Sequence, residues 1–506
     1  MTASSSRTLV RPARHRAALL GVALALAAGV ALRFARLELR SFWLDEAYTV
    51  EVARAPLEDI LAGRVGDAHT PPLYYALLHG WMALGTSDGW LRGFSALASC
   101  LVLLLVGLVP ALAWPSTETR WWTIGLLAVS PYQVYFAQEA RMYSLATVLV
   151  LAVVLLEGAA SRGGRWPVHA GLAAAGALGL YCHYYLAFVI AGSAAWRGWR
   201  LWRRAASGDR WHWWWAAHLG IALAFAPWLA TVVRLASSVG QTFRSLLWAV
   251  PPYAAVRFLV GYGVMPHDTA LEQQPLRTVL AAWPWLAVAA VVGAIALAGL
   301  VRAFRQNPRS SQNAALSHAA TVVACTFLVP GLVSLAVPMY SERYLGIVQP
   351  LALLLIVAGV LQAPRRVAAG GLAALLALGL AGSALWTAGR GGKERWRDVA
   401  RLIAAEARSG ELVLVDPDYT RITLERYLRR RDLAVVPVSQ GRPPATVGCR
   451  PGQLRPGERV WVTLSHQSQP VEAWQQAFAP CAALALRRVE PDGVGVTVLA
   501  FEARAP

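Results

Sequence analysis

Long apolar runs recur along almost the whole chain, and they constrain its fold more than any other feature. About eleven of them reach or approach the roughly 20 residues with which an α-helix crosses a bilayer. They cover Ala17–Leu37, Leu91–Trp114, Trp121–Ala137, Met142–Ala159, Pro167–Tyr181, Tyr184–Trp202, Trp214–Leu235, Val279–Val301, Ala315–Val337, Tyr344–Leu361 and Val367–Ala388. Because 57% of the 506 residues are hydrophobic, the pattern predicts a polytopic α-helical membrane protein with about 11 transmembrane helices.

Basic residues set the orientation of these spans. The net charge of +19 would suggest a nucleic-acid partner in a soluble protein, but here the arginines fall in short links between apolar runs. If residues 1–16 form a cytoplasmic tail, every second link is rich in arginine, as the positive-inside rule requires. These residues are Arg120, Arg162, Arg165, Arg197, Arg200, Arg203, Arg204, Arg210, Arg302, Arg305, Arg309, Arg365 and Arg366. We therefore expect no nucleic-acid partner and a retained first span, with a cleaved signal peptide as the alternative.

The composition changes after Gly391. Helical spacing over Trp396–Ala407 and Thr420–Arg430 alternates with three apolar strand-like runs. The runs are Glu411–Asp416, Leu433–Val438 and Arg459–Leu464. This alternation predicts a small α/β domain over residues 391–506, and an odd number of spans would place it outside the cell. Cys449 and Cys481 lie in this domain, where oxidising conditions would permit a disulfide.

The links that this orientation places outside carry the titratable residues. Charged groups beside a hydrocarbon span are costly unless a site needs them. The first such link, residues 38–90, holds Asp45, Glu46, Asp67 and His69. Later outside links hold Glu139 with Arg141, His183 with two tyrosines, and Arg343 with Tyr344. Residues 251–263, which also lie outside, are expected to form an interfacial helix or a plain loop. Since the arginines on the other face set the orientation, this clustering independently indicates an outward-facing site.

Asp45 and Glu46 directly follow the first span. Their plain interpretation is a solvated helix start, with Asp45 as the helix cap. Their functional interpretation is a carboxylate that takes a proton from an acceptor hydroxyl. Only one of two adjacent carboxylates is expected to face a substrate, so we assign the base to Asp45 and a capping or stabilising role to Glu46.

Asp67 and His69 precede Pro71-Pro72 and Tyr74. They form either a polar turn before a proline-initiated helix or contacts to a divalent cation or a donor phosphate. Two ligands make half a metal site, so a metal is possible and no cofactor is certain. Tyr74 is a further candidate for donor binding.

Arginines on two other outside links suit a phosphate. Arg141 beside Glu139 either closes an ion pair that anchors a turn or offers a phosphate a bidentate contact, and Arg343 with Tyr344 offers another. His183 with Tyr184 and Tyr185 indicates either interfacial aromatics or a surface on which a sugar stacks.

Four motifs in this order resemble those of the GT-C membrane glycosyltransferases. They are Trp43–Glu46, Asp67–Tyr75, Gln138–Leu145 and Glu342–Tyr344, and the resemblance covers residues 15 to 390. The resemblance is strongest to bacterial members of the protein mannosyltransferase and lipid A aminoarabinose transferase superfamily. The resemblance implies a GT-C domain over residues 17–390 in the bacterial inner membrane. It also implies an inverting transfer from a polyprenyl-phosphate sugar to a lipid, glycan or protein hydroxyl.

The same resemblance places the family's first-loop aspartate on Asp45 and its second acidic residue on Glu139. In the aminoarabinose branch a Glu-Lys pair precedes the two prolines, whereas this chain has His69-Thr70. That difference argues against an aminoarabinose donor. A non-enzymatic transporter or flippase of a lipid-linked sugar and an oligosaccharide ligase are the alternatives.

Overall fold

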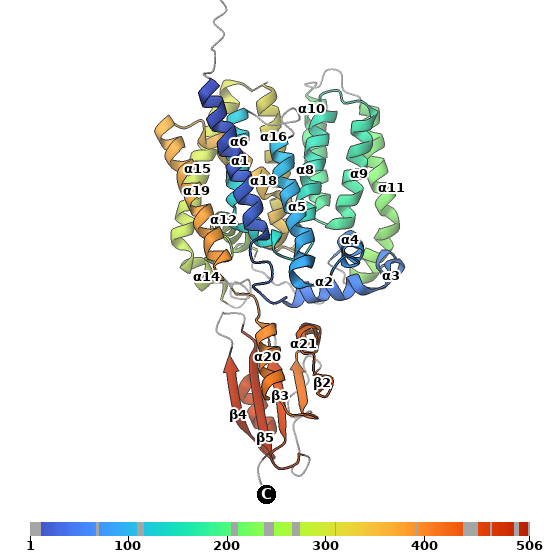
Figure 1. Cartoon of the computed structure of the whole chain (residues 1–506). Coiled ribbons are helices and arrows are strands. Elements are labelled where there is room, and N and C mark those ends of the chain that lie inside the picture. The colour runs from blue at the N-terminus through green and yellow to red at the C-terminus, as the bar shows by residue number, and fades with distance from the viewer. Residues whose placement is uncertain are drawn as a thin grey trace, which may run out of the picture.

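The computed structural model consists of a bundle of long helices with a small sheet domain attached at one end (Figure 1). It describes residues 12–66, 70–108, 116–203, 211–236, 247–265, 274–308, 310–337, 339–390, 392–438, 454–465, 468–489 and 495–503.

Seven helical segments in the described residues are long and apolar enough to cross a membrane. They are α5 (Asp88–Leu108), α8 (Tyr143–Ala160), α11 (Trp211–Ala236), α15 (Trp283–Gln306), α16 (Ser311–Val333), the run α17–η1–α18 (Glu342–Leu345, Gly346–Val348, Gln349–Val360) and α19 (Arg365–Thr387). Shorter or less regular helices of the bundle are α1 (Pro12–Phe34), α6 (Thr117–Val129), α7 (Pro131–Ala137), α9 (Trp166–Cys182) and α10 (Leu186–Trp202). Each of the eleven expected runs thus contains a helix, and the count of eleven membrane crossings stays a prediction.

The third expected span is broken into α6 and α7 at Ser130-Pro131. Proline at the first position of α7 needs no hydrogen bond for its nitrogen, and the Ser130 hydroxyl accepts one from the Gln133 N–H at 3.3 Å. The last carbonyls of α6 are satisfied from other helices: Arg33 donates to two of them at 3.0 Å, and Ser383 donates to a third at 2.8 Å. These contacts fix the break between α6 and α7.

Short helices cover the end of the bundle near the sheet domain. They are α2 (Leu44–Arg54), α3 (Leu57–Leu61), α4 (Leu73–Met82), α12 (Val250–Val260) and α14 (Pro275–Ala281). In Figure 1, α2 lies across this end. The helix α12 was expected in the headgroup plane or as a loop. It is a helix, and it packs against α7, α15, α17 and α19 with one buried face that includes Tyr253, Val256 and Val260; a position in the headgroup plane stays a prediction.

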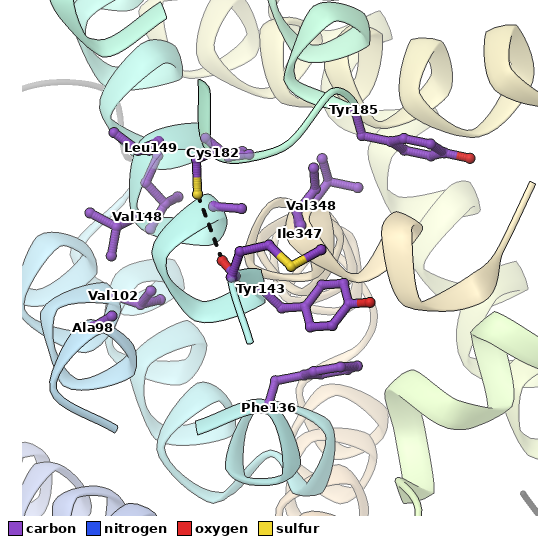
Figure 2. Close-up of a cluster of buried hydrophobic side chains, with 14 of the residues drawn as sticks. Ala98, Val102, Phe136, Tyr143, Val148, Leu149, Cys182, Tyr185, Ile347 and Val348 are labelled. Carbon is purple, nitrogen blue, oxygen red and sulfur yellow. Dashed lines mark hydrogen bonds between the residues drawn. The ribbon is translucent and has the colours of Figure 1, made fainter. Parts of the chain in front are cut away.

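The core of the bundle centres on α8, of which 78% is buried. Figure 2 shows Val148 and Leu149 of α8 among side chains from α5 and η1. Between apolar helices such packing stabilises mainly through van der Waals contact. Because α8 is held on all sides, the residues just before it have a fixed position at the end of the bundle.

In its described residues the sheet domain contains a five-stranded mixed sheet in the order β2-β1-β3-β5-β4. Its elements are α20 (Trp396–Glu406), β1 (Leu412–Asp416), η2 (Asp418–Thr420), α21 (Arg421–Tyr427), β2 (Ala434–Pro437), β3 (Arg459–Leu464), α22 (Val471–Phe478), β4 (Ala482–Val489) and β5 (Thr497–Ala503). Strands β2, β1 and β3 run parallel to one another, and β5 pairs antiparallel with both of its neighbours, β3 and β4. The predicted α/β domain is confirmed. Cys449 lies outside the described residues, so its pairing with Cys481 stays a prediction.

One buried carboxylate joins the sheet domain to the bundle. Asp88, at the start of α5, accepts hydrogen bonds from Arg397 at 2.7 Å, Arg426 at 2.6 Å and the Tyr427 hydroxyl at 2.5 Å. The Ser41 hydroxyl adds a bond to the Glu394 carbonyl at 2.6 Å. Charge-assisted bonds of this kind are about twice as strong as neutral ones, so the first loop and the link to the sheet domain pack as one layer.

Candidate active site

Asp45 and Glu46 lie in the first turn of α2, which begins after Trp43 in an extended conformation. Unpaired N–H groups and the helix dipole favour negative charge at this position. Successive residues of a helix point in different directions, and the two carboxylates have different surroundings. The Asp45 side chain is 31% exposed, whereas that of Glu46 is 0% exposed.

Glu46 is held on every side by donors. Arg92 donates to both of its oxygens at 2.7 Å, the Ala140 N–H donates at 2.9 Å, and Lys393 Nζ lies at 3.2 Å. Burial alone would raise the pKa of Glu46, but the charges of Arg92 and Lys393 and these bonds outweigh it and lower the pKa to about 2. Glu46 therefore ties the first loop to α5, to the turn before α8 and to the link after α19, and has no free side towards a substrate.

Asp45 has looser partners and is partly exposed. Its Oδ2 is 3.5 Å from Arg343 Nη1 and 3.9 Å from Arg141 Nη2. Both arginines are positioned by other groups: the Arg343 guanidinium lies 4.7 Å above the Trp43 ring, and Arg141 donates to Thr49 Oγ1 at 3.0 Å. The site thus combines one accessible carboxylate with two oriented cations from distant parts of the chain.

Glu139 lies behind Trp43. The Trp43 indole N–H donates to Glu139 Oε1 at 2.7 Å, and Lys393 Nζ is 3.7 Å from the same oxygen. Its Oε2 has no hydrogen-bond partner in the part of the chain that the structure describes. Burial raises the pKa of Glu139, with the charge of Lys393 opposing. Glu139 therefore orients Trp43. Among the described residues, its ion pair is with Lys393 and not with Arg141 or Arg343.

Aromatic rings form a wall beside these charges. Tyr344 makes edge contacts with His183 at 5.0 Å and Tyr185 at 5.2 Å between ring centroids, and Tyr143 lies 5.9 Å from His183. His183 Nδ1 accepts the Tyr185 N–H at 3.1 Å. Burial, and then the charge of Arg141, lowers the pKa of His183 to about 3, so the ring is neutral. Its Nε2 is without a hydrogen-bond partner among the described residues.

Tyr74 lies deeper than the donor-binding prediction implied. It is 0% exposed, its hydroxyl hydrogen-bonds with Ser95 Oγ at 2.8 Å, and Ser95 donates to the Arg141 carbonyl at 3.1 Å. Tyr74 thus supports the backbone beneath Arg141. Asp67 and His69 lie outside the described residues. Within the described ranges no group of three or more His, Cys, Asp or Glu side chains could hold a metal ion, and metal binding stays a prediction.

Several residues at the site were not predicted from the sequence. Arg92 could have been suspected, because a charge at the edge of an apolar run needs a partner. Lys393 is the single lysine among 47 basic residues other than histidine, and its side chain is 1% exposed between Glu46 and Glu139. Glu342, whose Oε1 accepts the Tyr262 hydroxyl at 2.7 Å, belongs to the Glu342–Tyr344 motif but was given no role from the sequence.

Comparison with solved structures shows the fold. No protein-family model and no curated protein matches the sequence. The crystal structure of ArnT from Cupriavidus metallidurans in the apo state matches 96% of this chain and 98% of its own, with a TM-score of 0.56 and 14% identity. The Archaeoglobus fulgidus oligosaccharyltransferase in complex with Zn and sulfate matches 88% of this chain and 68% of its own, with a TM-score of 0.51 and 11% identity. The chain has the GT-C fold of the membrane glycosyltransferases, as its motifs predict.

Proposed function

We propose that this protein is a membrane glycosyltransferase. It moves a monosaccharide from a polyprenyl-phosphate donor to a hydroxyl of a lipid, glycan or protein acceptor, with inversion at the anomeric carbon. The fold supports this proposal. The observation that carries it is the partly exposed carboxylate of Asp45, with Arg141 and Arg343 beside it.

Asp45 is the general base in this proposal. As the acceptor oxygen attacks the anomeric carbon, its proton passes to the Asp45 carboxylate and the bond from that carbon to the donor phosphate breaks. The electron pair of that bond leaves with the phosphate. Proton transfer to a positioned base contributes about 10²–10⁴ in rate. Asp45 is preferred to Glu46 and Glu139 because both of these are buried and hydrogen-bonded to donors of the protein.

Arg141 and Arg343 stabilise the departing phosphate. Their contacts to Asp45, at 3.9 and 3.5 Å, are longer than the 2.7 Å contact of Arg92 to Glu46, so Asp45 holds these two arginines less tightly than Glu46 holds Arg92. Arg141 also precedes the start of α8, where the helix dipole favours an anion. Charge placed in advance around a leaving phosphate is an efficient form of catalysis. Tyr344 and His183 beside it provide a surface for the sugar.

The orientation is part of the proposal. The candidate site lies at the end of the bundle that carries the sheet domain (Figure 1). We place this end outside the inner membrane, because the arginine-rich links that follow α10 and precede α19 lie at the other end. The sheet domain, residues 391–506, is then extracytoplasmic, and residues 1–16 are cytoplasmic.

Two alternative functions, a flippase or transporter and an oligosaccharide ligase, would also bind a lipid-linked sugar. A flippase or transporter of a lipid-linked sugar would bind the donor without consuming it, and transporters hold their charged site near the bilayer midplane, whereas Asp45 lies in a helix across one end of the bundle. An oligosaccharide ligase would consume a larger lipid-linked glycan. The size of the donor that reacts separates the ligase from the monosaccharide transferase.

The test is turnover by purified protein with a panel of polyprenyl-phosphate monosaccharides and a total lipid and glycan extract as acceptor, followed by mass spectrometry. We expect one donor to be consumed, and Asp45→Asn to slow its consumption by 10²-fold or more. Glu51→Gln is the matched control, because Glu51 lies on the same helix and is 58% exposed. Donor that persists with the wild-type protein for every sugar, or full turnover by Asp45→Asn, would refute the proposal.

A further inference from the structure

Trp43 lies where distant parts of the chain meet. It is 5% exposed and immediately precedes α2. Its indole N–H donates to Glu139 Oε1, on the turn between α7 and α8, and the guanidinium of Arg343, in α17, lies 4.7 Å from the centre of its ring. Lys393 Nζ, from the connector between α19 and α20, lies 5.8 Å from the same ring centre. The Trp43 ring therefore joins a buried ion pair to a cation beside Asp45.

The hydrogen bond from Trp43 to Glu139 is short, at 2.7 Å. Hydrogen bonds with an ionised partner are shorter and stronger than neutral ones. A donor held by a carboxylate is polarised, so electron density moves into the indole ring, and successive polar contacts strengthen one another in this way. Because a cation over an indole is attracted by the negative face of the ring, Glu139 strengthens the contact between Trp43 and Arg343.

Lys393 favours the ionised form of Glu139. Its Nζ lies 3.7 Å from Glu139 Oε1 and 3.2 Å from Glu46 Oε2, and its side chain is 1% exposed. Burial raises the pKa of Glu139, the charge of Lys393 is the largest effect that opposes this rise, and the neighbouring Glu46 adds to it. Two carboxylates beside one buried site do not both ionise readily without a cation. Loss of the ammonium would therefore favour the protonated form of Glu139 and weaken its bond to Trp43.

The place of the Trp43 ring also decides where Arg343 can donate. A guanidinium presents its N–H groups in one plane, so the ring beside it limits the directions in which that plane can lie. The same guanidinium is 3.5 Å from Asp45 Oδ2. A misplacement of about 1 Å in such a positioned group can cost about 10²-fold in rate.

A second tryptophan provides a comparison within the same protein. The Trp386 indole N–H donates to Gln138 Oε1 at 2.9 Å, and the Arg40 guanidinium lies 3.4 Å from the centre of the Trp386 ring. The arrangement is the same, but the acceptor is a neutral amide. Arg40 also donates to two backbone carbonyls at the end of α19, at 2.6 and 3.1 Å. Arg40 thus fixes the loop after α1 to α19, whereas Arg343 lies beside Asp45.

We propose that Trp43 and Lys393 are positioning residues for the donor phosphate. In this proposal Lys393 favours the ionised form of Glu139. Glu139 polarises the Trp43 ring, and the ring holds Arg343 in place for the phosphate. The inference rests on the proposed function, in which Arg343 contacts that phosphate. It makes the connector to the sheet domain part of the support of the donor site.

The test is the affinity of the full-length protein in detergent for polyprenyl phosphate, measured by equilibrium binding of the radiolabelled lipid. Trp43→Phe keeps an aromatic ring but removes the indole N–H. We expect it to weaken binding about 5- to 30-fold, the range for a weakened cation–π contact in a desolvated place. Trp386→Phe is the matched control, because it removes the equivalent N–H beside Arg40, and it should leave the affinity unchanged.

A double-mutant cycle separates positioning from a loss of structure. In a protein that already carries Arg343→Gln, Trp43→Phe should not weaken binding further, because the group through which Trp43 acts has been removed. Lys393→Met should weaken binding as Trp43→Phe does, and the two changes together should weaken it no more than either alone. Glu139→Gln keeps an oxygen for the indole N–H but removes the charge, and it gives the same readout if Lys393→Met does not fold.

Three outcomes would overturn the inference while the wild-type protein still binds the lipid. They are unchanged binding by Trp43→Phe, an equal loss in the Arg343→Gln protein, and an equal loss with Trp386→Phe. Additive losses for Lys393→Met and Trp43→Phe would overturn the role of Lys393. A wild-type protein that binds no polyprenyl phosphate would refute the proposed function, and this inference with it.

Discussion

Replacing Glu46 by glutamine tests whether this carboxylate is the structural centre of the site. Glutamine keeps the size of the side chain and can still accept the Ala140 N–H, but it removes the negative charge. Arg92 and Lys393, whose side chains are 2% and 1% exposed, then lose their shared partner. An uncompensated buried charge is strongly destabilising.

The magnitude follows from the pKa of Glu46. Its fall from an ordinary 4.5 to about 2 corresponds to about 3 kcal/mol of stability at neutral pH. This value lies at the lower end of the roughly 3–5 kcal/mol seen when one partner of a buried ion pair is removed. We therefore expect Glu46→Gln to lose about 3 kcal/mol or slightly more.

The pH dependence has a definite sign. Because the pKa of Glu46 is depressed in the folded protein, its contribution is present above pH 4.5 and is lost as the pH falls towards 2. The wild-type protein should therefore lose this stability over that window, while Glu46→Gln has none of it to lose. The difference between the two proteins should narrow between about pH 5 and pH 3.

The assay is thermal unfolding of the detergent-solubilised proteins, followed by tryptophan fluorescence at several pH values. Glu51→Gln is the control, because it removes a carboxylate from the same helix whose pair with Arg54 is more than half exposed. Such surface pairs are worth about 0–1 kcal/mol. If Glu46→Gln unfolds at the wild-type temperature at pH 7, or if the difference does not narrow in acid, the proposed role of Glu46 is wrong.

Two further predictions concern the donor and the orientation. Arg343→Ala should weaken binding of a polyprenyl-phosphate donor by about 10- to 100-fold, the loss of a charged hydrogen bond, with little effect on the acceptor. A donor titration measures this loss, and Arg390→Ala, at an exposed position, is the control. An equal loss of donor and acceptor binding would contradict the role of Arg343 in binding the donor phosphate. A reporter enzyme fused after Pro506 should be active only outside the cytoplasm, and cytoplasmic activity would invert the orientation.

The sequence predicted the helices and the gathering of charged residues at one end because both depend on local pattern. Apolar runs long enough to cross a bilayer leave little choice but a helix. Asp45, Arg141 and Arg343 could be found because charges beside such runs are rare. Three strands of the sheet domain, β1, β2 and β3, were predicted to within one residue, whereas β4 and β5 were not predicted. The sequences of β1 and β3 are continuously apolar because these strands are buried on both faces.

The sequence analysis assigned the base to Asp45 and a stabilising role to Glu46, but the contacts that distinguish the two carboxylates could not be predicted in this way. Whether Asp45 or Glu46 is the exposed carboxylate depends on which side of α2 meets Arg92, a partner 46 residues away from Glu46. The depth of Tyr74 depends in the same way on Ser95 of a later helix. The break between α6 and α7 did have a local signal in Ser130-Pro131, which the hydrophobicity of that run concealed.

The position of Lys393 has a consequence for protein engineering. A domain boundary drawn at residue 391 runs between the last membrane helix and the sheet domain, yet the ammonium that lies between Glu46 and Glu139 comes from the far side of that boundary. Chimaeras that exchange the C-terminal module should be joined beyond this short connector. A chain truncated at residue 391 would lose the buried Lys393 ammonium together with the sheet domain. Inactivity of such a truncated chain would therefore not show that the sheet domain binds a substrate.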